Sequence, residues 1–308
     1  MLLWWERLRD RWWARRLADA GIRTCEKIGL SETRGLRIGG GSLVLPRTGR
    51  AAQLLESYPH LCALSAAGAV YLEGDSLDAI VISGVRLNLF HAQAIQLAAE
   101  IFAQGVYAVA ISRPVIVVDV GMNIGTAALF FAVRYPDAGV VGFEPISQSY
   151  QHALANLQAN PGLAARIEPV NAAWGTAPGL RVVRYCPDSP GDGGFYEIPA
   201  GLCAQKQVRE EEVRVVSAVE SLDEIRQRYP GREIVLKLDC EGSEHEILSS
   251  LRDAGRLMDV RIVLVEWHRR AREDMPDRIR ELLVGAGFVV FGDAVAGAEC
   301  GLMKAVRT

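Results

Sequence analysis

The sequence lacks the features that mark several common classes of protein. Its six cysteines form no CxxC pair and no zinc-ligand spacing, so we expect free thiols and a reducing, cytoplasmic location. No apolar run approaches the ~20 residues that span a bilayer. The apolar start at residues 1–5 is interrupted at once by charged residues, unlike a secretory signal. The formal net charge of −3 argues against a nucleic-acid partner held by bulk electrostatics.

The composition that is present suits a globular protein with a sizeable core. Half of the 308 residues are hydrophobic and 23% are charged, which argues against global disorder. After Pro114, strand-like runs alternate with helical segments, and this order predicts an α/β fold with a doubly wound, mostly parallel sheet. We expect this domain to occupy residues 91–308, behind an N-terminal helical and β extension at residues 1–90.

The extension begins with a segment rich in tryptophan and arginine. Its apolar side chains fall at helical spacing over residues 1–20, which predicts an amphipathic helix. We favour docking of this helix on the chain's own core or on a partner subunit, as in a homo-oligomer, over peripheral contact with a membrane. Residues 35–60 indicate a short strand pair or a connection, residues 69–90 a small antiparallel element, and residues 91–104 a helix.

The main domain gives a regular series of elements. We expect strands at residues 115–120, 139–143, 167–172, 234–239, 260–266, 288–291 and 302–306. We expect helices at residues 124–134, 147–159, 221–228, 243–254 and 274–286. The β-rich runs at 180–185 and 212–217 predict a hairpin or flap, and the Gly/Pro-rich loop at 186–203 should shape a substrate pocket.

The strongest motif is a glycine turn directly after the first strand of this domain. The turn is VDVGMNIG, in which Gly121, Asn123 and Gly125 follow Asp119. The glycines let the backbone approach a ligand at the carboxyl end of the strand, where open α/β sheets bind cofactors. Since an acid beside a pyrophosphate would repel it, Asp119 suits a cofactor that carries an amine and no phosphate. The structural alternative is a tight strand-to-helix turn with a capping acid.

Two further segments predict contacts with the same cofactor. Glu144 ends the next strand, at the offset of about 20 residues where an acid commonly binds ribose hydroxyls. The alternative for Glu144 is an exposed glutamate at a strand end. Ala173 and Trp174 end the third strand, where an adenine ring commonly rests, although core packing of Trp174 fits the sequence equally well.

Acidic residues and a histidine after two later strands are the candidates for a general base. Lys237, Asp239 and Glu241 alternate, so they share one face of a strand and its exit. A lysine in a core strand needs a partner, and a structural ion cluster is therefore the alternative reading. His268 follows the next strand and is a third candidate, with a surface histidine as its alternative. We rank them Asp239, Glu241 and then His268.

The same side chains are also candidate ligands for a metal ion. Together with Glu266, the three base candidates offer ligands that a divalent ion accepts. Nothing in their spacing requires an ion, and we therefore predict no metal site.

The blocks VDVGMNIG, FEP, SLDEI, KLDCEGSE and LVEWH, in this order, resemble the FkbM-type methyltransferases. The resemblance covers residues 90–290 approximately, and the sequence departs from the family's usual residues at Met122, Cys240 and Ser243. It implies a Rossmann-like class I methyltransferase fold with S-adenosylmethionine as cofactor. It also implies O-methylation of a small hydroxylated substrate, such as a sugar, a polyketide or another natural product.

On this basis we assign the predicted site residues. Asp119, Gly121, Asn123 and Gly125 should cradle the methionine part of the cofactor, and Glu144 should bind the ribose. Two other classes of protein stay open. A nicotinamide-dependent Rossmann enzyme would need a third glycine that the turn lacks. A non-catalytic subunit that recruits a partner would not need the acidic residues that the sequence retains.

Overall fold

The computed structural model describes residues 16, 29–30, 35–39, 41–46, 48–187, 189–196, 208–270, 273–292 and 298–307. By their contacts the residues form two units, Met1–Val106 and Tyr107–Thr308, and each is described by itself. The division expected at residue 90 stays a prediction. The helix predicted over residues 1–20 lies outside the described residues except at Arg16. Among the helices that the structure describes, none has the length and apolar character needed to cross a bilayer.

The first unit contains two small antiparallel sheets and short helices. Its elements in chain order are β1 (Gly29–Leu30), β2 (Gly35–Arg37), β3 (Val44–Pro46), α2 (Gly49–Gln53), η1 (Leu54–Ser57), α3 (Tyr58–Ala66), β4 (Val70–Leu72), β5 (Ala79–Ile82), β6 (Val85–Asn88), α4 (Gln93–Ala98) and the π-helical η2 (Ala99–Ala103). Sheet β4-β5-β6 confirms the antiparallel element predicted at 69–90. The helices between β3 and β4 were not predicted; the first of them begins where the Thr48 side chain accepts a hydrogen bond from the backbone of Ala51.

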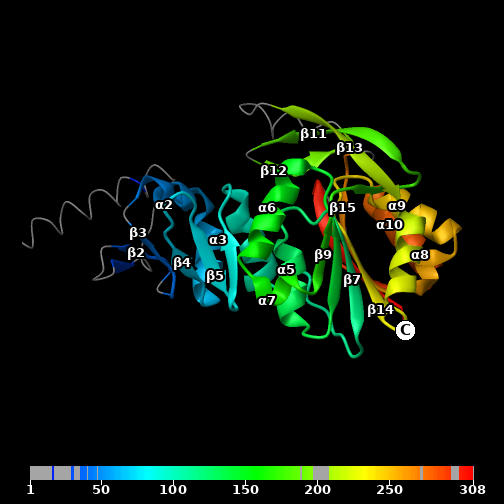
Figure 1. Ribbon diagram of the computed structural model, residues 1–308, viewed down its shortest axis with the longest axis horizontal. Coiled ribbons are helices and arrows are strands. Elements are labelled where there is room, and N and C mark those ends of the chain that lie inside the picture. The colour runs from blue at the N-terminus through cyan, green and yellow to red at the C-terminus, as the bar shows by residue number, and fades with distance from the viewer. Residues whose placement is uncertain are drawn as a thin grey trace, which may run out of the picture. The chain divides into compact units, whose positions relative to one another are not determined.

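The second unit is built on a seven-stranded sheet (Figure 1). Its strands are β7 (Val115–Val120), β8 (Gly139–Phe143), β9 (Ile167–Val170), β14 (Glu233–Leu238), β15 (Val260–His268), β16 (Val289–Phe291) and β17 (Cys300–Val306). They lie in the order β16-β17-β15-β14-β7-β8-β9, parallel except for β16 and β17. β7 is the first strand of this sheet along the chain, and later strands are added on both sides of it, so the predicted doubly wound sheet is confirmed. The strand order reverses between β7 and β14, which is where such sheets bind ligands.

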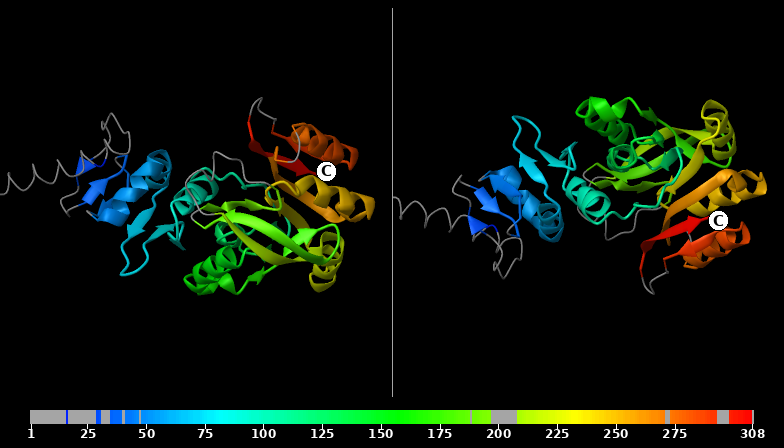
Figure 2. Two further views of the ribbon diagram at one scale, coloured as in Figure 1. Left: turned by 90° about the horizontal axis from the view of Figure 1, so that it is seen from above. Right: turned by 90° about the horizontal axis from the view of Figure 1, so that it is seen from below.

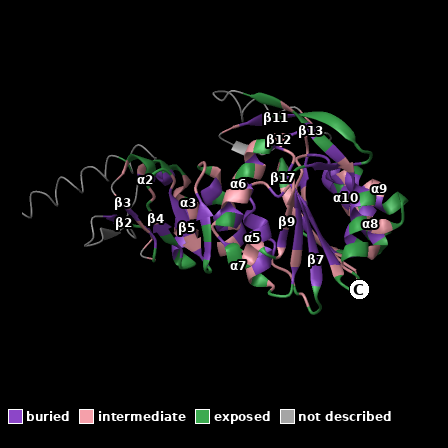
Figure 3. Cartoon of the chain, viewed as in Figure 1, coloured by how far each residue is buried: buried purple, intermediate pink, exposed green. Residues whose placement is uncertain are grey.

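Helices cover both faces of this sheet and explain its hydrophobic strands. On one side lie α5 (Thr126–Arg134), α6 (Ser147–Gln158) and α7 (Pro161–Ala164), and on the other lie α8 (Ala218–Arg228), α9 (Glu244–Asp253), η3 (Arg256–Asp259) and α10 (Met275–Gly285) (Figure 1). All six side chains of β7 are buried as a result, as Figure 3 shows. Each buried Val, Leu or Ile contributes about 1.5–3 kcal/mol to folding, so this core fixes the positions of the strand ends.

A second, four-stranded sheet lies beyond the carboxyl ends of the central strands (Figures 1 and 2). It comprises β10 (Ala173–Gly175), β11 (Gly179–Cys186), β12 (Ser189–Gly194) and β13 (Arg209–Ser217). The antiparallel pairing of β11 with β13 confirms the predicted hairpin or flap. The strand predicted at 167–172 ends earlier, because Ala173 and Trp174 pair with β13 instead. The prediction of free thiols is wrong for Cys186, which is disulfide-bonded.

Candidate functional site

One pocket lies at the carboxyl ends of β7, β8 and β14, at the point where the strand order reverses. Predicted site residues that line it are Gly121, Asn123, Glu144, Ala173, Trp174, Asp239 and Glu241. Asp119, Gly125 and His268 are not among its lining residues. The lining also includes Gly193, Gly194 and Phe195, which belong to the segment predicted to shape a substrate pocket. The fold therefore brings together residues from several distant segments of the sequence.

The glycine turn after β7 lies tightly against the end of β14. Gly121 has a φ of +81°, a backbone conformation that favours glycine. A Cβ atom on Gly121 would overlap the carbonyl oxygen of Asp239. The amide of Asp239 donates a hydrogen bond of 3.0 Å to the carbonyl of Val120. Glycine is thus required here by the contact between two strand ends, in addition to the ligand approach that the sequence suggested.

Lys237 holds this junction together from inside the sheet. Its side chain is 2% exposed, and its Nζ lies 3.1 Å from Asp119 Oδ1 and 3.3 Å from Asp239 Oδ2. It also donates a hydrogen bond of 2.7 Å to the carbonyl of Gly121. Burial alone would lower the pKa of Lys237, but the charges of Asp119 and Asp239 outweigh burial and raise it. The lysine is therefore charged and paired, as its place in a core strand requires.

Asp119 is fully buried against this lysine. Its side chain has no exposed surface, and burial raises its pKa while the charge of Lys237 opposes the rise. The carboxylate fixes Lys237, which in turn holds the glycine turn through the Gly121 carbonyl. The structure therefore gives Asp119 a supporting position beneath the turn. Its predicted contact with the methionine part of the cofactor stays a prediction.

Glu144 is buried at the edge of the pocket, so the alternative of an exposed strand-end glutamate is wrong. One carboxylate oxygen accepts a hydrogen bond of 2.8 Å from the amide of Asn123, and the other accepts one of 2.9 Å from the amide of Ile146. Burial raises the pKa of Glu144 to about 7, although both amide donors favour the charged form. The side chain thus connects the glycine turn to the end of β8.

The pocket contains aromatic rings and polar atoms that lack partners. Trp174, on β10, is 1% exposed, belongs to the core cluster to which α8 and α9 contribute, and also lines the pocket. Its ring centroid is 5.2 Å from that of Phe143. Among the described residues that line the pocket, Asn123 Oδ1, Ser243 Oγ and Trp174 Nε1 are buried without a hydrogen-bond partner. Trp174 therefore both packs in the core and lines the pocket, and these three polar atoms are available to a ligand.

Asp239 and Glu241 extend from β14 toward the pocket, and His268 lies behind them at the end of β15. The Asp239 side chain is 24% exposed. Glu241 Oε2 lies 2.6 Å from the guanidinium of Arg270 and 3.4 Å from His268 Nε2. His268 is buried, so the alternative of a surface histidine is wrong. The structure thus gathers the three base candidates, with Asp239 the most accessible.

Glu244 organises this end of the sheet. It is fully buried and accepts hydrogen bonds from the amides of Cys240 and Gly242, while its Oε1 lies 3.0 Å from His268 Nδ1. Burial alone would lower the pKa of His268, but Glu244 and Glu241 outweigh burial and raise it to about 10. His268 therefore holds a proton near neutral pH and is a poor base in this state.

Tyr107 is a site residue that the sequence did not reveal. Its hydroxyl lies 3.4 Å from Asp239 Oδ2 and 3.3 Å from Glu266 Oε2, and its ring centroid lies 5.6 Å from Lys237 Nζ. Its ring stacks on Phe131 of α5. Tyr107 precedes the first strand of the main domain and belongs to no motif, so no sequence signal could have placed it beside Asp239.

Comparison with known proteins gives consistent matches. The methyltransferase FkbM domain family matches residues 119–290. Methyltransferase sdnD of Sordaria araneosa is 25% identical over 72% of this chain and 90% of its own length. The 31-O-demethyl-FK506 methyltransferase FkbM of Streptomyces tacrolimicus is 28% identical over 63% of this chain and 81% of its own length. The crystal structure of methyltransferase FkbM from Methylobacillus flagellatus KT is 13% identical, with a TM-score of 0.44, and covers 83% of this chain and 60% of its own.

Proposed function

We propose that this chain, which belongs to the methyltransferase FkbM domain family, methylates a hydroxyl oxygen of a small molecule with S-adenosylmethionine as the methyl donor. The observation that carries the proposal is the pocket that joins the glycine turn, Glu144 and Asp239 at the reversal point of the sheet. An oxygen acceptor also fits the relative from Streptomyces tacrolimicus, whose name describes an O-methylation. Sugars, polyketides and similar natural products are the acceptors that we would test first.

The pocket fits S-adenosylmethionine in chemistry. Gly121 exposes backbone where the methionine part would lie, and Asn123 Oδ1 and Ser243 Oγ offer buried polar atoms without partners among the described residues. Glu144 can accept hydrogen bonds from both ribose hydroxyls. Trp174 and Ala173 offer an apolar surface for the adenine ring. When bound, S-adenosylmethionine supplies a methyl group already activated by its sulfonium.

The chain itself must orient the acceptor and remove its proton. In-line transfer requires the acceptor oxygen to be held in position, which is a large part of the rate enhancement available to such an enzyme. Asp239 is the best-placed base, because its carboxylate lines the pocket and is the most exposed of the three candidates. Lys237 and Tyr107 hold that carboxylate from the side away from solvent. Glu241, paired with Arg270, can contact the acceptor.

The test is calorimetric titration with S-adenosylhomocysteine, followed by transfer of an isotopically labelled methyl group to a panel of hydroxylated sugars and polyketides. We expect binding and a product whose labelled methyl is bonded to oxygen by NMR. Absence of binding, or a methyl found on nitrogen or carbon, would contradict the proposal. Binding without turnover on any acceptor would instead favour the non-catalytic subunit. Tight NADH binding alone would favour the nicotinamide enzyme, which does not fit the family.

A further inference from the structure

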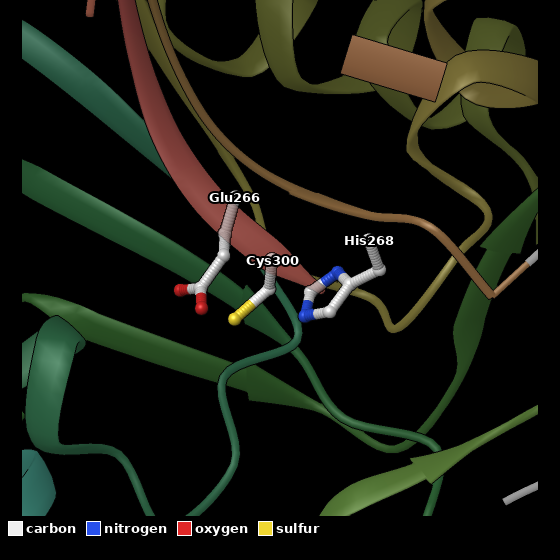
Figure 4. Close-up of side chains that lie close together, drawn as sticks. All are labelled: Glu266, His268 and Cys300. Atoms are coloured by element: carbon white, nitrogen blue, oxygen red, sulfur yellow. The ribbon is translucent and has the colours of Figure 1, made fainter. Parts of the chain in front are cut away.

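A second group of side chains with metal-binding chemistry lies beside the pocket (Figure 4). Glu266 and His268 alternate on β15, so they share one face of the sheet. Cys300 is the register partner of His268 on the antiparallel strand β17 and therefore lies on the same face. A carboxylate oxygen, an imidazole nitrogen and the thiol sulfur of these residues all lie within 4.8 Å of one another. Strand register, which the sequence does not reveal, brings the three together.

A buried carboxylate orients the histidine of this group. His268 is 6% exposed, and its Nδ1 lies 3.0 Å from Oε1 of the fully buried Glu244. The other ring nitrogen, Nε2, lies 3.4 Å from Glu241 Oε2 and also faces Cys300 and Glu266 in Figure 4. A carboxylate on one imidazole nitrogen with the other nitrogen directed at a ligand set is the arrangement found around metal-bound histidines. Glu244 lies outside the group of three, so this is an independent observation.

We propose that Glu266, His268 and Cys300 bind a divalent transition-metal ion of the zinc type. One carboxylate, one imidazole and one thiolate form a mixed O, N and S donor set that suits Zn²⁺ and Co²⁺ better than Mg²⁺ or Ca²⁺. Tetrahedral ligand atoms at about 2.0–2.3 Å from zinc are about 3.3–3.8 Å apart. Donor atoms that now lie up to 4.8 Å apart therefore need to approach one another by up to about 1.5 Å. On binding, the Cys300 thiol and the Nε2 of the charged His268 ring each release a proton to solvent, and no oxidation or reduction takes place.

The neighbouring combination of Asp239, Glu241 and His268 also places its donor atoms within 4.8 Å. There, however, positive side chains already occupy the carboxylates. Lys237 lies 3.3 Å from Asp239, and Arg270 lies 2.6 Å from Glu241. An ion bound by these acids would have to displace both cations, whereas Cys300 is an exposed thiol outside any disulfide and can be reached from solvent. The strands β15 and β17 therefore provide the favoured ligands.

The ion would have a direct use at the adjacent pocket. Three protein ligands leave a fourth position open, as in catalytic zinc sites. His268 Nε2 lies 3.4 Å from Glu241, which lines the pocket. An acceptor hydroxyl bound at the open position would become more acidic, and Asp239 would take its proton. This last step rests on the proposed methyl transfer, whereas metal binding does not.

The test uses the full-length, tag-free chain after treatment with a chelator, titrated with Co²⁺ and followed by absorption. We expect one Co²⁺ per chain, with an intense near-ultraviolet band that reports a thiolate ligand and disappears when Zn²⁺ is added. Cys300→Ser should lose the band, whereas Cys62→Ser, which changes a thiol in the first unit, should retain it. Glu244→Gln should weaken Co²⁺ affinity by about 10–100-fold. Circular dichroism checks that each variant is folded.

The outcomes separate this proposal from the proposed function. Absence of the band, or a band that survives in a folded Cys300→Ser variant, overturns the metal site. A Cys300-dependent band together with unchanged methyl transfer after chelation supports the site and overturns its role toward the acceptor. A Cys300-dependent band in a chain that binds no S-adenosylhomocysteine supports the site while the proposed function fails.

Discussion

Lys237 helps to separate the structural role of one neighbouring carboxylate from the chemical role of the other. It contacts both Asp119 and Asp239, but these two acids differ in exposure: the first is fully buried and the second faces the pocket. If Asp239 loses its charge, Lys237 keeps Asp119 as a partner. If Asp119 is replaced by a neutral residue, Lys237 loses its fully buried partner and keeps only the partly exposed Asp239. The same lysine therefore makes one carboxylate structural and leaves the other available for chemistry.

Substituting Asp239→Asn should therefore lower turnover by about 10²-fold or more, with thermal stability and S-adenosylhomocysteine affinity near those of the wild type. The matched control is Asp119→Asn, which disrupts the fully buried ion pair and should cost on the order of 3–5 kcal/mol of unfolding free energy. Kinetics per folded molecule and chemical denaturation measure the two effects. An Asp239→Asn variant with full activity would transfer the role of base to Glu241 or His268.

Glu144 gives a prediction that depends on pH. Its pKa is raised to about 7 by burial, so its charged form increases as pH rises from 6 to 8. The charged form is the better acceptor for ribose hydroxyls, and S-adenosylhomocysteine should therefore bind more tightly at pH 8 than at pH 6. Glu144→Gln should weaken binding by about 10–100-fold, the equivalent of 1.5–3 kcal/mol, and should abolish the pH dependence. Calorimetry at several pH values tests this; an equal slope in the variant would contradict it.

At the scale of elements, the site depends on how closely the ends of β7 and β14 approach each other. Gly121→Ala would place a Cβ atom against the Asp239 carbonyl in a backbone conformation that alanine rarely adopts. We expect it to lower the unfolding free energy by about 2 kcal/mol or more and to abolish S-adenosylhomocysteine binding, as measured by denaturation and calorimetry.

The matched control is a glycine with space around it. Gly162, in α7, has no left-handed φ, and a Cβ atom added to it would meet no other atom within 4 Å. Gly162→Ala should therefore change the unfolding free energy by no more than about 0.5 kcal/mol and leave binding intact. Similar losses in both variants would show that the contact between β7 and β14 is not what requires glycine at residue 121.

At the scale of the whole molecule, the candidate cofactor residues all belong to the second unit, Tyr107–Thr308. Deleting residues 1–20, which contain four of the chain's tryptophans by sequence, should leave S-adenosylhomocysteine affinity nearly unchanged and remove an interface. Light scattering distinguishes a lost homo-oligomer, and sedimentation with lipid vesicles distinguishes a lost membrane contact. Unchanged assembly, solubility and vesicle binding in the truncated chain would contradict an interface in this segment.

The sequence by itself determined most elements of the second unit, but it did not predict α7, β10 or β12, the last of which lies in the segment expected to be a loop. The continuous apolar run of β7, the glycine turn that follows it and the alternation of strands with helices are local patterns, because hydrophobic period and turn residues act over a few neighbouring positions. The same local signals identified Glu144 and Asp239 as acids at the carboxyl ends of strands. The boundary between β9 and β10 could not be read in this way, because pairing with β13, which is distant in sequence, decides it.

Tertiary structure decided what each of these side chains does. Register places Lys237 opposite Asp119, which buries that acid beneath the turn and directs Asp239 to the pocket. Pairing of β15 with β17 places Cys300 opposite His268, and packing on α5 places Tyr107 beside Asp239. Two carboxylates around His268 keep it protonated, against its expected use as a base. Burial and charge depend on neighbours far apart in the chain, and only the folded arrangement of strands supplies those neighbours.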